Sequence, residues 1–276
     1  MRQTQEIKVL SFRRGRPGPS RRVRVVAGEA PLVIEIRGGA AYTIMRTPGA
    51  DRELAAGFLF SEGLIRGASD IQTLAECPED PDVVRVTLAA GPGRGAERNL
   101  AVNSSCGLCG RADVKSLVAG LSPVAGAIKV PLEVLYQLPG KVRSGQALFE
   151  STGGTHAAAL FDPRGQVLAL REDLGRHNAL DKVLGWALLS GAPLAGTGVF
   201  LTGRISLEMV VKAARAGLPL VAAASAPTAA AIELARRLGL TLCGFVRGDE
   251  VTVYTHPSRV EAAAARPARR GRRSRA

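Results

Sequence analysis

Cysteine and aromatic residues are scarce in this chain of 276 residues. It has four cysteines, and only 4% of its residues are Phe, Trp or Tyr. So few cysteines exclude a disulfide-rich scaffold, and so few aromatics predict a mostly aliphatic core. The apolar share of 46% is enough to build a sizeable core. We therefore expect one large domain or two of ordinary size.

Long apolar runs are also missing. No stretch is long and apolar enough to span a bilayer. No apolar run of signal length follows the arginine pairs Arg13-Arg14 and Arg21-Arg22. The sequence therefore predicts a soluble protein of the cytoplasm that does not bind membranes, in a compartment where thiols stay reduced.

The net charge of +13 is concentrated at the two ends of the chain. Residues 1–24 carry eight bases and one acid, and residues 259–276 carry seven bases and one acid. Residues 25–258 hold 22 bases and 22 acids. We expect a basic flexible arm over 1–24 and a basic flexible tail over 259–276. Because the body is neutral, nucleic acid is not the expected partner, although the two ends could contact RNA, acidic proteins or anionic lipid.

Residues 25–140 are predicted to form a smaller, β-containing part. Strands are expected at 32–36, 41–45, 82–88 and, more weakly, 99–102. The first two flank Gly38-Gly39, which is a hairpin signal. Thr47-Pro48 predicts the start of a helix that runs to about Phe60, with Thr as the cap and Pro at the first helical position.

Strand and helix patterns alternate in residues 141–258, which predicts an α/β domain that binds the ligand. The expected strands are 156–161, 167–170, 198–202, 219–224 and 241–246. The expected helices are 131–149, with a break at Pro139-Gly140, and 178–190, 206–216 and 228–238. The strands from 198 onward are apolar throughout, which is typical of parallel strands covered by helices on both faces.

Ligands bind such sheets beyond the carboxyl ends of the strands. Here those ends are residues 202–206, 224–228 and 246–250. The first two lead into helices that Ser206 and Thr228 could cap. Backbone amides at helix starts attract phosphate, and Arg204 or Arg247 could add charged hydrogen bonds. The pattern favours a phosphate-bearing ligand, with ordinary capping and turn chemistry as the alternative.

Residues 172–182, E-D-L-G-R-H-N-A-L-D-K, crowd ionisable side chains at a strand-to-helix junction. His177 is a candidate general acid or base. Asp173, Arg176 and Asn178 either bind a ligand or hold one another, and a network of ion pairs and caps is the structural alternative. The T-G-G-T-H segment at 152–156 predicts a loop whose backbone closely approaches another group.

Cys106 and Cys109 form a C-x-x-C pair within N-S-S-C-G-L-C-G-R, residues 103–111. Such a pair can hold zinc, shuttle a disulfide or carry sulfur. Structural zinc needs about four ligands, and Cys77, Cys243 and the histidines are isolated in the sequence, so we expect no metal. Flanking glycines allow backbone movement, and nearby bases lower a thiol pKa. Both favour a nucleophilic sulfur carrier, and a redox dithiol stays open.

These motifs together resemble the FdhD family, the formate dehydrogenase accessory sulfurtransferases, from about residue 25 to 260. The motifs that carry the resemblance are S-S-C-G-L-C-G at 104–110, S-T-G-G-T-H at 151–156, the 172–182 cluster, L-T-G-R-I-S-L-E-M-V-V-K at 201–212, and F-V-R-G-D-E with Y-T-H-P near the end. The resemblance implies a three-layer α/β sandwich similar to cytidine deaminases, with a smaller N-terminal part. The zinc deaminase signature is missing, so deaminase chemistry is not expected.

The resemblance also implies a sulfurtransferase that carries persulfide sulfur. A cysteine desulfurase would load Cys106, with Cys109 assisting. The sulfur would pass to the molybdenum cofactor, Mo-bis-molybdopterin guanine dinucleotide, before its insertion into formate dehydrogenase. The segment that matches the family's cofactor contacts is Phe245, Val246, Arg247, Gly248, Asp249 and Glu250.

Thr202, Arg204 and His177 are further cofactor-binding candidates from the sequence pattern. For an accessory factor of this kind we expect a homodimer. The alternatives are a thiol–disulfide redox protein and a chaperone that only binds the molybdenum cofactor.

Overall fold

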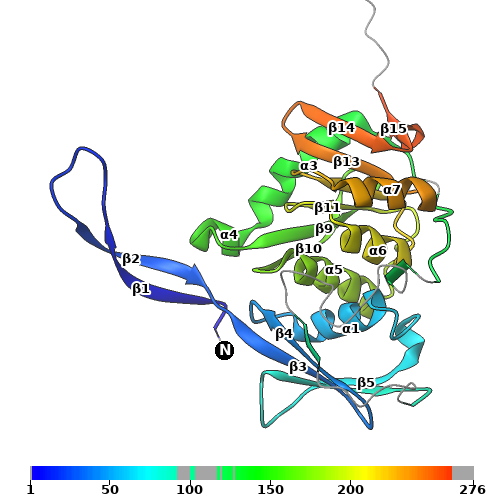
Figure 1. The fold of residues 1–276 in the computed structure, drawn as a ribbon, viewed down its shortest axis with the longest axis horizontal. Coiled ribbons are helices and arrows are strands. Elements are labelled where there is room, and N and C mark those ends of the chain that lie inside the picture. The colour runs from blue at the N-terminus through cyan, green and yellow to red at the C-terminus, as the bar shows by residue number, and fades with distance from the viewer. Residues whose placement is uncertain (1, 92–99, 103–116, 119, 127, 263–276) are drawn as a thin grey trace, which may run out of the picture.

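The computed structural model describes residues 2–91, 100–102, 117, 118, 120–126 and 128–262. The strands of its larger sheet are β9 (His156–Phe161), β10 (Val167–Asp173), β11 (Gly198–Leu201), β12 (Leu220–Ala223), β13 (Thr241–Arg247) and β14 (Glu250–Thr255). They lie in the order β10-β9-β11-β12-β13-β14 (Figure 1). Strands β11, β12 and β13 are parallel, as their alternation with helices predicts, and the other neighbours are antiparallel.

Helices cover both faces of this sheet. They are α3 (Leu132–Gly145), α4 (Ala147–Thr152), α5 (Arg176–Ser190), α6 (Leu207–Arg215) and α7 (Ala229–Leu238). Because side chains alternate along a strand, Ala158 and Leu160 of β9 belong to the buried cluster that includes residues of α5, α6 and α7. Ala157 and Ala159 pack with Leu138 of α3 on the opposite face. The three-layer α/β sandwich is therefore confirmed, while its likeness to cytidine deaminases stays a prediction.

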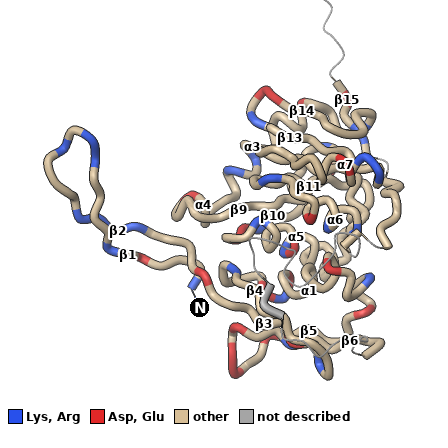
Figure 2. The backbone as a smooth tube through the Cα atoms, in the orientation of Figure 1, with Lys and Arg blue, Asp and Glu red and all other residues tan. Residues whose placement is uncertain are grey.

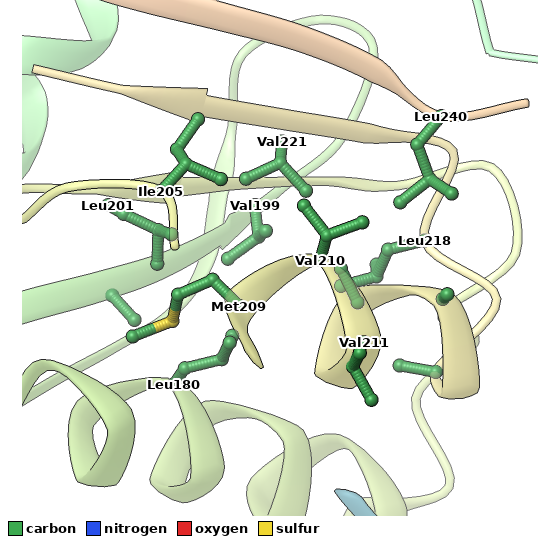
Figure 3. Close-up of a cluster of buried hydrophobic side chains, with 14 of the residues drawn as sticks. Leu180, Val199, Leu201, Ile205, Met209, Val210, Val211, Leu218, Val221 and Leu240 are labelled. Atoms are coloured by element: carbon green, nitrogen blue, oxygen red, sulfur yellow. The ribbon is translucent and has the colours of Figure 1, made fainter. Parts of the chain in front are cut away.

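The core on the α5 and α6 side is aliphatic, as the low aromatic content predicts. Figure 3 shows Met209 and Val210 of α6 between Leu180 of α5 and the strand residues Val199 and Val221. These side chains are fully buried. Their burial fixes α6 against the sheet and so places the loop that precedes α6.

The smaller part is a second sheet with one helix packed on it. Its elements are β3 (Ala30–Ile36), β4 (Ala41–Arg46), α1 (Asp51–Ser61), η1 (Ala68–Asp70), β5 (Ile71–Glu76), β6 (Val83–Leu88) and β7 (Leu100–Val102). The strand order is β5-β6-β3-β4-β7, and β3 and β4 form the expected antiparallel hairpin. Leu54 and Phe58 of α1 pack on this sheet. The opposite side of α1 packs on α5, so α1 joins the two parts (Figure 1).

The predicted helix start at Thr47-Pro48 is wrong. The helix begins at Asp51, after Ala50 in a left-handed conformation with φ 56°. Thr47 is buried, and its backbone N–H donates to the Asp173 carboxylate over 3.1 Å. Its hydroxyl accepts from the N–H of Leu174 over 3.0 Å. Asp173 lies 126 residues away in the chain, so local capping rules could not anticipate this use of Thr47.

The predicted break at Pro139-Gly140 is also misplaced. Helix α3 runs through Pro139 to Gly145, and the break comes at Gln146, before α4. A proline inside a helix removes one hydrogen bond and crowds the preceding turn. Leu135, Leu138 and Val142 are fully buried around it. The free energy gained by packing this face of α3 against the sheet outweighs the free-energy cost of a proline inside the helix.

The ends of the chain are more ordered than the sequence predicted. Strands β1 (Thr4–Ser11) and β2 (Ser20–Ala27) form an antiparallel hairpin, where no strand was predicted before residue 32. The excess of basic residues in 1–24 favoured a flexible arm, although Arg22-Val23-Arg24-Val25 alternates polar and apolar residues as a strand does. At the other end, η2 (Pro257–Arg259) precedes β15 (Val260–Glu261), which pairs with β8 (Val130–Pro131). Residues 263–276 of the expected tail lie outside the described residues.

Among the helices of the described ranges, none has the length and apolarity that a bilayer span requires.

Candidate functional site

Several loops and helix starts meet at one edge of the six-stranded sheet. The parallel strands β11, β12 and β13 all end there, and α6 and α7 begin there. Strand β9 runs antiparallel to β11, so His156 at its start lies at the same edge, paired with Asp173 at the end of β10. Helix α5 begins there at Arg176. We call this region the carboxyl edge; it comprises residues 152–156, 173–177, 202–206, 224–228 and 245–250.

Gly203 allows three of these segments to meet. A Cβ atom added to it would lie 3.2 Å from both Cβ and Cδ of Arg176 and 3.5 Å from Nδ1 of His156. The loop after β11 therefore lies directly against Arg176 and His156. Gly203 is the glycine of the L-T-G-R motif at 201–204, and its role was not predicted. A small residue between a strand end and a helix start is the available signal.

Neighbouring charges shift the pKa values of His156, at the carboxyl edge, and of Glu208, in the first turn of α6. Burial and then the Arg176 charge lower the pKa of His156, against the opposing effect of Asp173. Burial alone would raise the pKa of Glu208 in α6. The Ser206 hydroxyl, the backbone and the charges of His177 and Arg176 outweigh it, and the pKa is lowered. The carboxylate that the charges of His177 and Arg176 stabilise here is that of Glu208.

Arg176 has a donor to spare. Its Nε atom is buried and has no hydrogen-bond partner among the described residues. Buried donors are nearly always paired in proteins, so an unused guanidinium N–H at a helix start suits an anionic ligand.

The helix starts differ in how they are capped. Thr228 caps α7, since its hydroxyl accepts the N–H of Ala231 over 3.3 Å, as predicted. Ser206 occupies the same position before α6, but its side chain makes no capping hydrogen bond. Arg204 is exposed in the loop between β11 and α6. The Thr202 hydroxyl accepts from the N–H of Ala157 over 2.9 Å, so this side chain holds β9 to the edge.

Residues 245–250 comprise the end of β13, the turn at 248–249 and the first residue of β14. Phe245 has a left-handed backbone, φ 49°, and its N–H donates to the Ser225 carbonyl over 3.2 Å. Arg247 donates from Nε to the Ala224 carbonyl over 2.7 Å, which ties the turn to the end of β12. Val246 is buried in the core. The remaining three residues, Gly248, Asp249 and Glu250, are exposed.

Most ionisable side chains of the 172–182 cluster form a network of ion pairs and hydrogen bonds within the protein, which was the structural alternative to ligand binding. The buried Asp173 carboxylate accepts from Gly175 N–H over 2.8 Å and from Asn178 Nδ2 over 2.9 Å. It pairs with Lys182 Nζ over 2.8 Å. Lys182 and Asn178 also donate to the carbonyls of Thr47 and Met45. These residues bind the smaller part to the sandwich, which leaves Arg176 as the cluster's candidate for ligand binding. His177 is buried beside it.

Glu172 orders the loop at 152–156. Its carboxylate accepts from the N–H groups of Leu148 and Phe149, at the start of α4, over 2.9 and 2.7 Å. It also accepts a hydrogen bond from the Thr155 hydroxyl over 2.7 Å. Thus the acid of the cluster fixes the segment that leads into His156.

A second buried ion pair links α6 to α5 and α1. Lys212 Nζ lies 2.8 Å from Asp181 Oδ2, 2.7 Å from Ser61 Oγ and 3.2 Å from Glu62 Oε1. Lys212 and Asp181 are almost completely buried. Burial raises the pKa of Asp181, so its charge depends on the nearby ammonium.

Replacing Lys212 by methionine is therefore expected to destabilise the fold by about 3–5 kcal/mol, because a buried carboxylate loses its partner. Urea unfolding followed by circular dichroism measures this. The double variant Lys212→Met/Asp181→Leu is expected to recover most of the loss, since it removes both charges. Equal destabilisation of the single and double variants would contradict this account.

Cys106 and Cys109 lie outside the described residues, so the persulfide prediction has no structural test here. Cys243 is fully buried in β13, and burial raises its pKa to about 12, which makes it unreactive. Cys77 is also buried. Within the described ranges, no three His, Cys, Asp or Glu side chains gather as a metal site. The absence of a metal stays a prediction.

Comparison with known proteins gives one consistent family. The model of the FdhD/NarQ family matches residues 27–261. The sulfur carrier protein FdhD of Mycolicibacterium paratuberculosis is 45% identical over 84% of this chain and 90% of its own length. That of Thermoplasma acidophilum is 42% identical over 85% and 86%.

A solved structure agrees. The crystal structure of a formate dehydrogenase accessory protein from Desulfotalea psychrophila has a TM-score of 0.77 and 27% identity, and the match covers 94% of this chain and 99% of that one. The resemblance seen in the motifs is thus confirmed over nearly the whole described chain, and the chain belongs to the FdhD/NarQ family.

Proposed function

We propose that this protein is a sulfurtransferase that carries persulfide sulfur from a cysteine desulfurase to the molybdenum cofactor before insertion into formate dehydrogenase. The observation that carries the proposal is the S-S-C-G-L-C-G motif in a chain 45% identical to a sulfur carrier protein. It acts in the cytoplasm as a homodimer.

Loading is an exchange between a thiol and a persulfide. The Cys106 thiolate attacks the terminal sulfur of the desulfurase persulfide. A new S–S bond forms on Cys106, the old one breaks, and the desulfurase cysteine leaves as a thiol. Neither oxidant nor reductant is consumed. The Arg98, Arg111 and Lys115 side chains close in sequence favour the thiolate.

Delivery needs two electrons, because the sulfur must reach the metal centre as sulfide. In the proposed step Cys109 attacks the inner sulfur of the Cys106 persulfide. The Cys106–Cys109 disulfide forms, sulfide leaves to the cofactor, and a cellular thiol reductant later reduces the disulfide. Cys109→Ala is therefore expected to load sulfur normally but to deliver little. Full delivery by this variant would remove the resolving role from Cys109.

The recipient cofactor binds at the carboxyl edge. Its guanine dinucleotide carries phosphates, and the edge offers the starts of α5, α6 and α7 together with the unused Nε donor of Arg176. Arg204 and the turn at 245–250 supply further exposed polar groups beside it.

Guanosine diphosphate is a fragment of the cofactor that tests this edge. Arg176→Gln is expected to weaken its binding about tenfold, because one charged hydrogen-bond donor is lost. Isothermal titration calorimetry measures the affinity. Arg236→Gln, on the exposed last turn of α7, is the matched control and should bind normally. If Arg176→Gln binds as well as the original protein, the phosphates lie elsewhere.

The proposal as a whole is tested by reconstitution. Purified protein, cysteine desulfurase, cysteine, molybdenum cofactor and apo-formate dehydrogenase are combined, and formate oxidation is followed. Activity should appear only when this protein is present. A chaperone that only binds the cofactor would support activity without a desulfurase, and that result would contradict sulfur transfer.

A further inference from the structure

His156 is a side chain of the carboxyl edge to which the proposed cofactor site gives no role. It lies at the start of β9 and is half-buried. Within the described ranges no hydrogen bond acts on its imidazole, whose pKa responds only to burial and to the charges of Arg176 and Asp173. A neutral imidazole has one donor and one acceptor nitrogen. That of His156 therefore keeps hydrogen-bonding capacity for a ligand.

Arg176 and His156 border the same small space beside the backbone of Gly203. A Cβ atom added to Gly203 would lie 3.2 Å from Cδ of Arg176 and 3.5 Å from Nδ1 of His156. The Nε atom of Arg176 is bonded to that Cδ, is buried and has no partner in the part of the chain that the structure describes. An anion that accepts a hydrogen bond from this Nε therefore lies close to the imidazole of His156.

The positive charge of Arg176 is not fully neutralised from within the protein. Arg176 helps to stabilise the Glu208 carboxylate, yet burial and then Arg176 still lower the pKa of His156. Asp173 opposes them, but its carboxylate pairs with Lys182 over 2.8 Å. The basic segments of β1 and β2 project away from the sheet (Figure 2). The other ionisable side chains of the segments that meet here are Glu172, His177 and Arg204. His156 is therefore mainly neutral in the free protein at pH 7.

A bound anion reverses this balance. A negative charge close to an imidazole favours its protonated form, and the same charge offsets the field of Arg176. Once protonated, His156 donates a charged hydrogen bond to the anion. Ligand and proton then bind together, because each stabilises the bound form of the other.

We propose that His156 binds the pyrophosphate of the guanine dinucleotide together with Arg176 and takes up a proton when it does so. This role of His156 rests on the cofactor site proposed above. The free imidazole loses its proton at a lower pH than the bound one. The affinity therefore rises as the pH falls through the pKa of the bound imidazole, and it becomes constant below the lowered pKa of the free one.

Isothermal titration calorimetry with diguanosine diphosphate tests this role. The phosphates of this probe are diesters, so they do not titrate near neutral pH. Titrations at pH 7 in buffers of different ionisation enthalpy give the number of protons taken up per ligand. We expect an uptake that His156→Gln abolishes, because glutamine keeps a donor and an acceptor but cannot be protonated. Between pH 8 and pH 6 the affinity of the original protein should rise about fivefold more than that of the variant.

His256→Gln is the matched control. His256 follows β14 at the opposite edge of the sheet, where Thr255 pairs with Leu242 near the start of β13. Its Nε2 atom lies 3.0 Å from the Arg236 carbonyl oxygen. This variant should bind the probe with the proton uptake of the original protein. Circular dichroism checks that each variant is folded.

Two outcomes separate the role of His156 from the site on which it depends. If Arg176→Gln weakens binding while the original protein and His156→Gln take up equal numbers of protons, the cofactor site stands and the role of His156 is wrong. If Arg176→Gln binds the probe as tightly as the original protein, or the original protein does not bind it, the site itself is wrong and the role of His156 falls with it.

Discussion

Replacing Cys106 by alanine is expected to reduce the activity of reconstituted formate dehydrogenase to the background seen without this protein. On the proposed mechanism the variant lacks the thiolate that accepts the terminal sulfur, so no persulfide forms at this position. Because a nucleophile is removed rather than misplaced, the loss should exceed 100-fold, comparable to removal of other catalytic nucleophiles. Formate oxidation after a fixed maturation time is the measurement.

Cys243→Ala is the matched control. It also removes a thiol, but this one is fully buried and its raised pKa of about 12 keeps it protonated. It should therefore mature the enzyme normally apart from a modest loss of stability. If both variants support maturation, Cys106 does not carry the sulfur. If both abolish it, the effect comes from folding rather than from chemistry.

Gly185→Ala is expected to destabilise the protein by about 3 kcal/mol or more. A Cβ atom at this position would lie 1.8 Å from the carbonyl oxygen of Glu53 and 2.8 Å from the backbone nitrogen of Gly57. Both obstacles are backbone atoms of α1, so no change of rotamer can relieve the overlap. Helices α1 and α5 must separate, and the contact that joins the two sheets is lost. Urea unfolding gives the change in free energy.

Gly140→Ala provides the comparison, because Gly140 lies in α3 with open space around its Cα. There alanine should be neutral or stabilising by up to about 1 kcal/mol, through its higher helix propensity. Similar free energies of unfolding for the two alanine variants would show that α1 and α5 are not closely packed.

The alternating part of the fold was predictable from the sequence because its signals are local. Apolar strands such as 198–202 and 219–224 each precede a helix pattern, and this dictates parallel strands. The β1–β2 hairpin was missed because the high charge of residues 1–24 was interpreted as a flexible arm, although Arg and Val alternate along β2. The start of α1 was misplaced because the backbone N–H of Thr47 donates a hydrogen bond to the carboxylate of Asp173, 126 residues away in the chain. Contacts between distant parts of the chain leave no trace in a local pattern.

The candidate site was predictable in outline and not in detail. The strand pattern correctly predicted that β11, β12 and β13 end at one edge of the sheet, and of the two predicted caps only Thr228 forms its hydrogen bond. Sequence alone could not tell which residues of the 172–182 cluster are structural and which are free to bind a ligand. Asp181 pairs with Lys212, and Lys182 pairs with Asp173, within a buried network. Only the three-dimensional arrangement separates these structural charges from Arg176, which keeps an unused donor beside Gly203.

A thiol–disulfide redox protein would share the same fold and the same C-x-x-C pair. It would show a reversible disulfide between Cys106 and Cys109 but would not hold sulfane sulfur after contact with a desulfurase. The two functions therefore differ in one observable, the presence of an extra sulfur atom on the protein.

Mass spectrometry of the protein after incubation with a cysteine desulfurase and cysteine measures that observable directly. We expect a mass increase of one sulfur atom, sensitive to a thiol reductant and mapped by proteolysis to the peptide that contains Cys106. The Cys106→Ala variant should show no such increase. An unmodified protein, with a desulfurase shown to be active in the same mixture, would contradict the sulfur-carrier function.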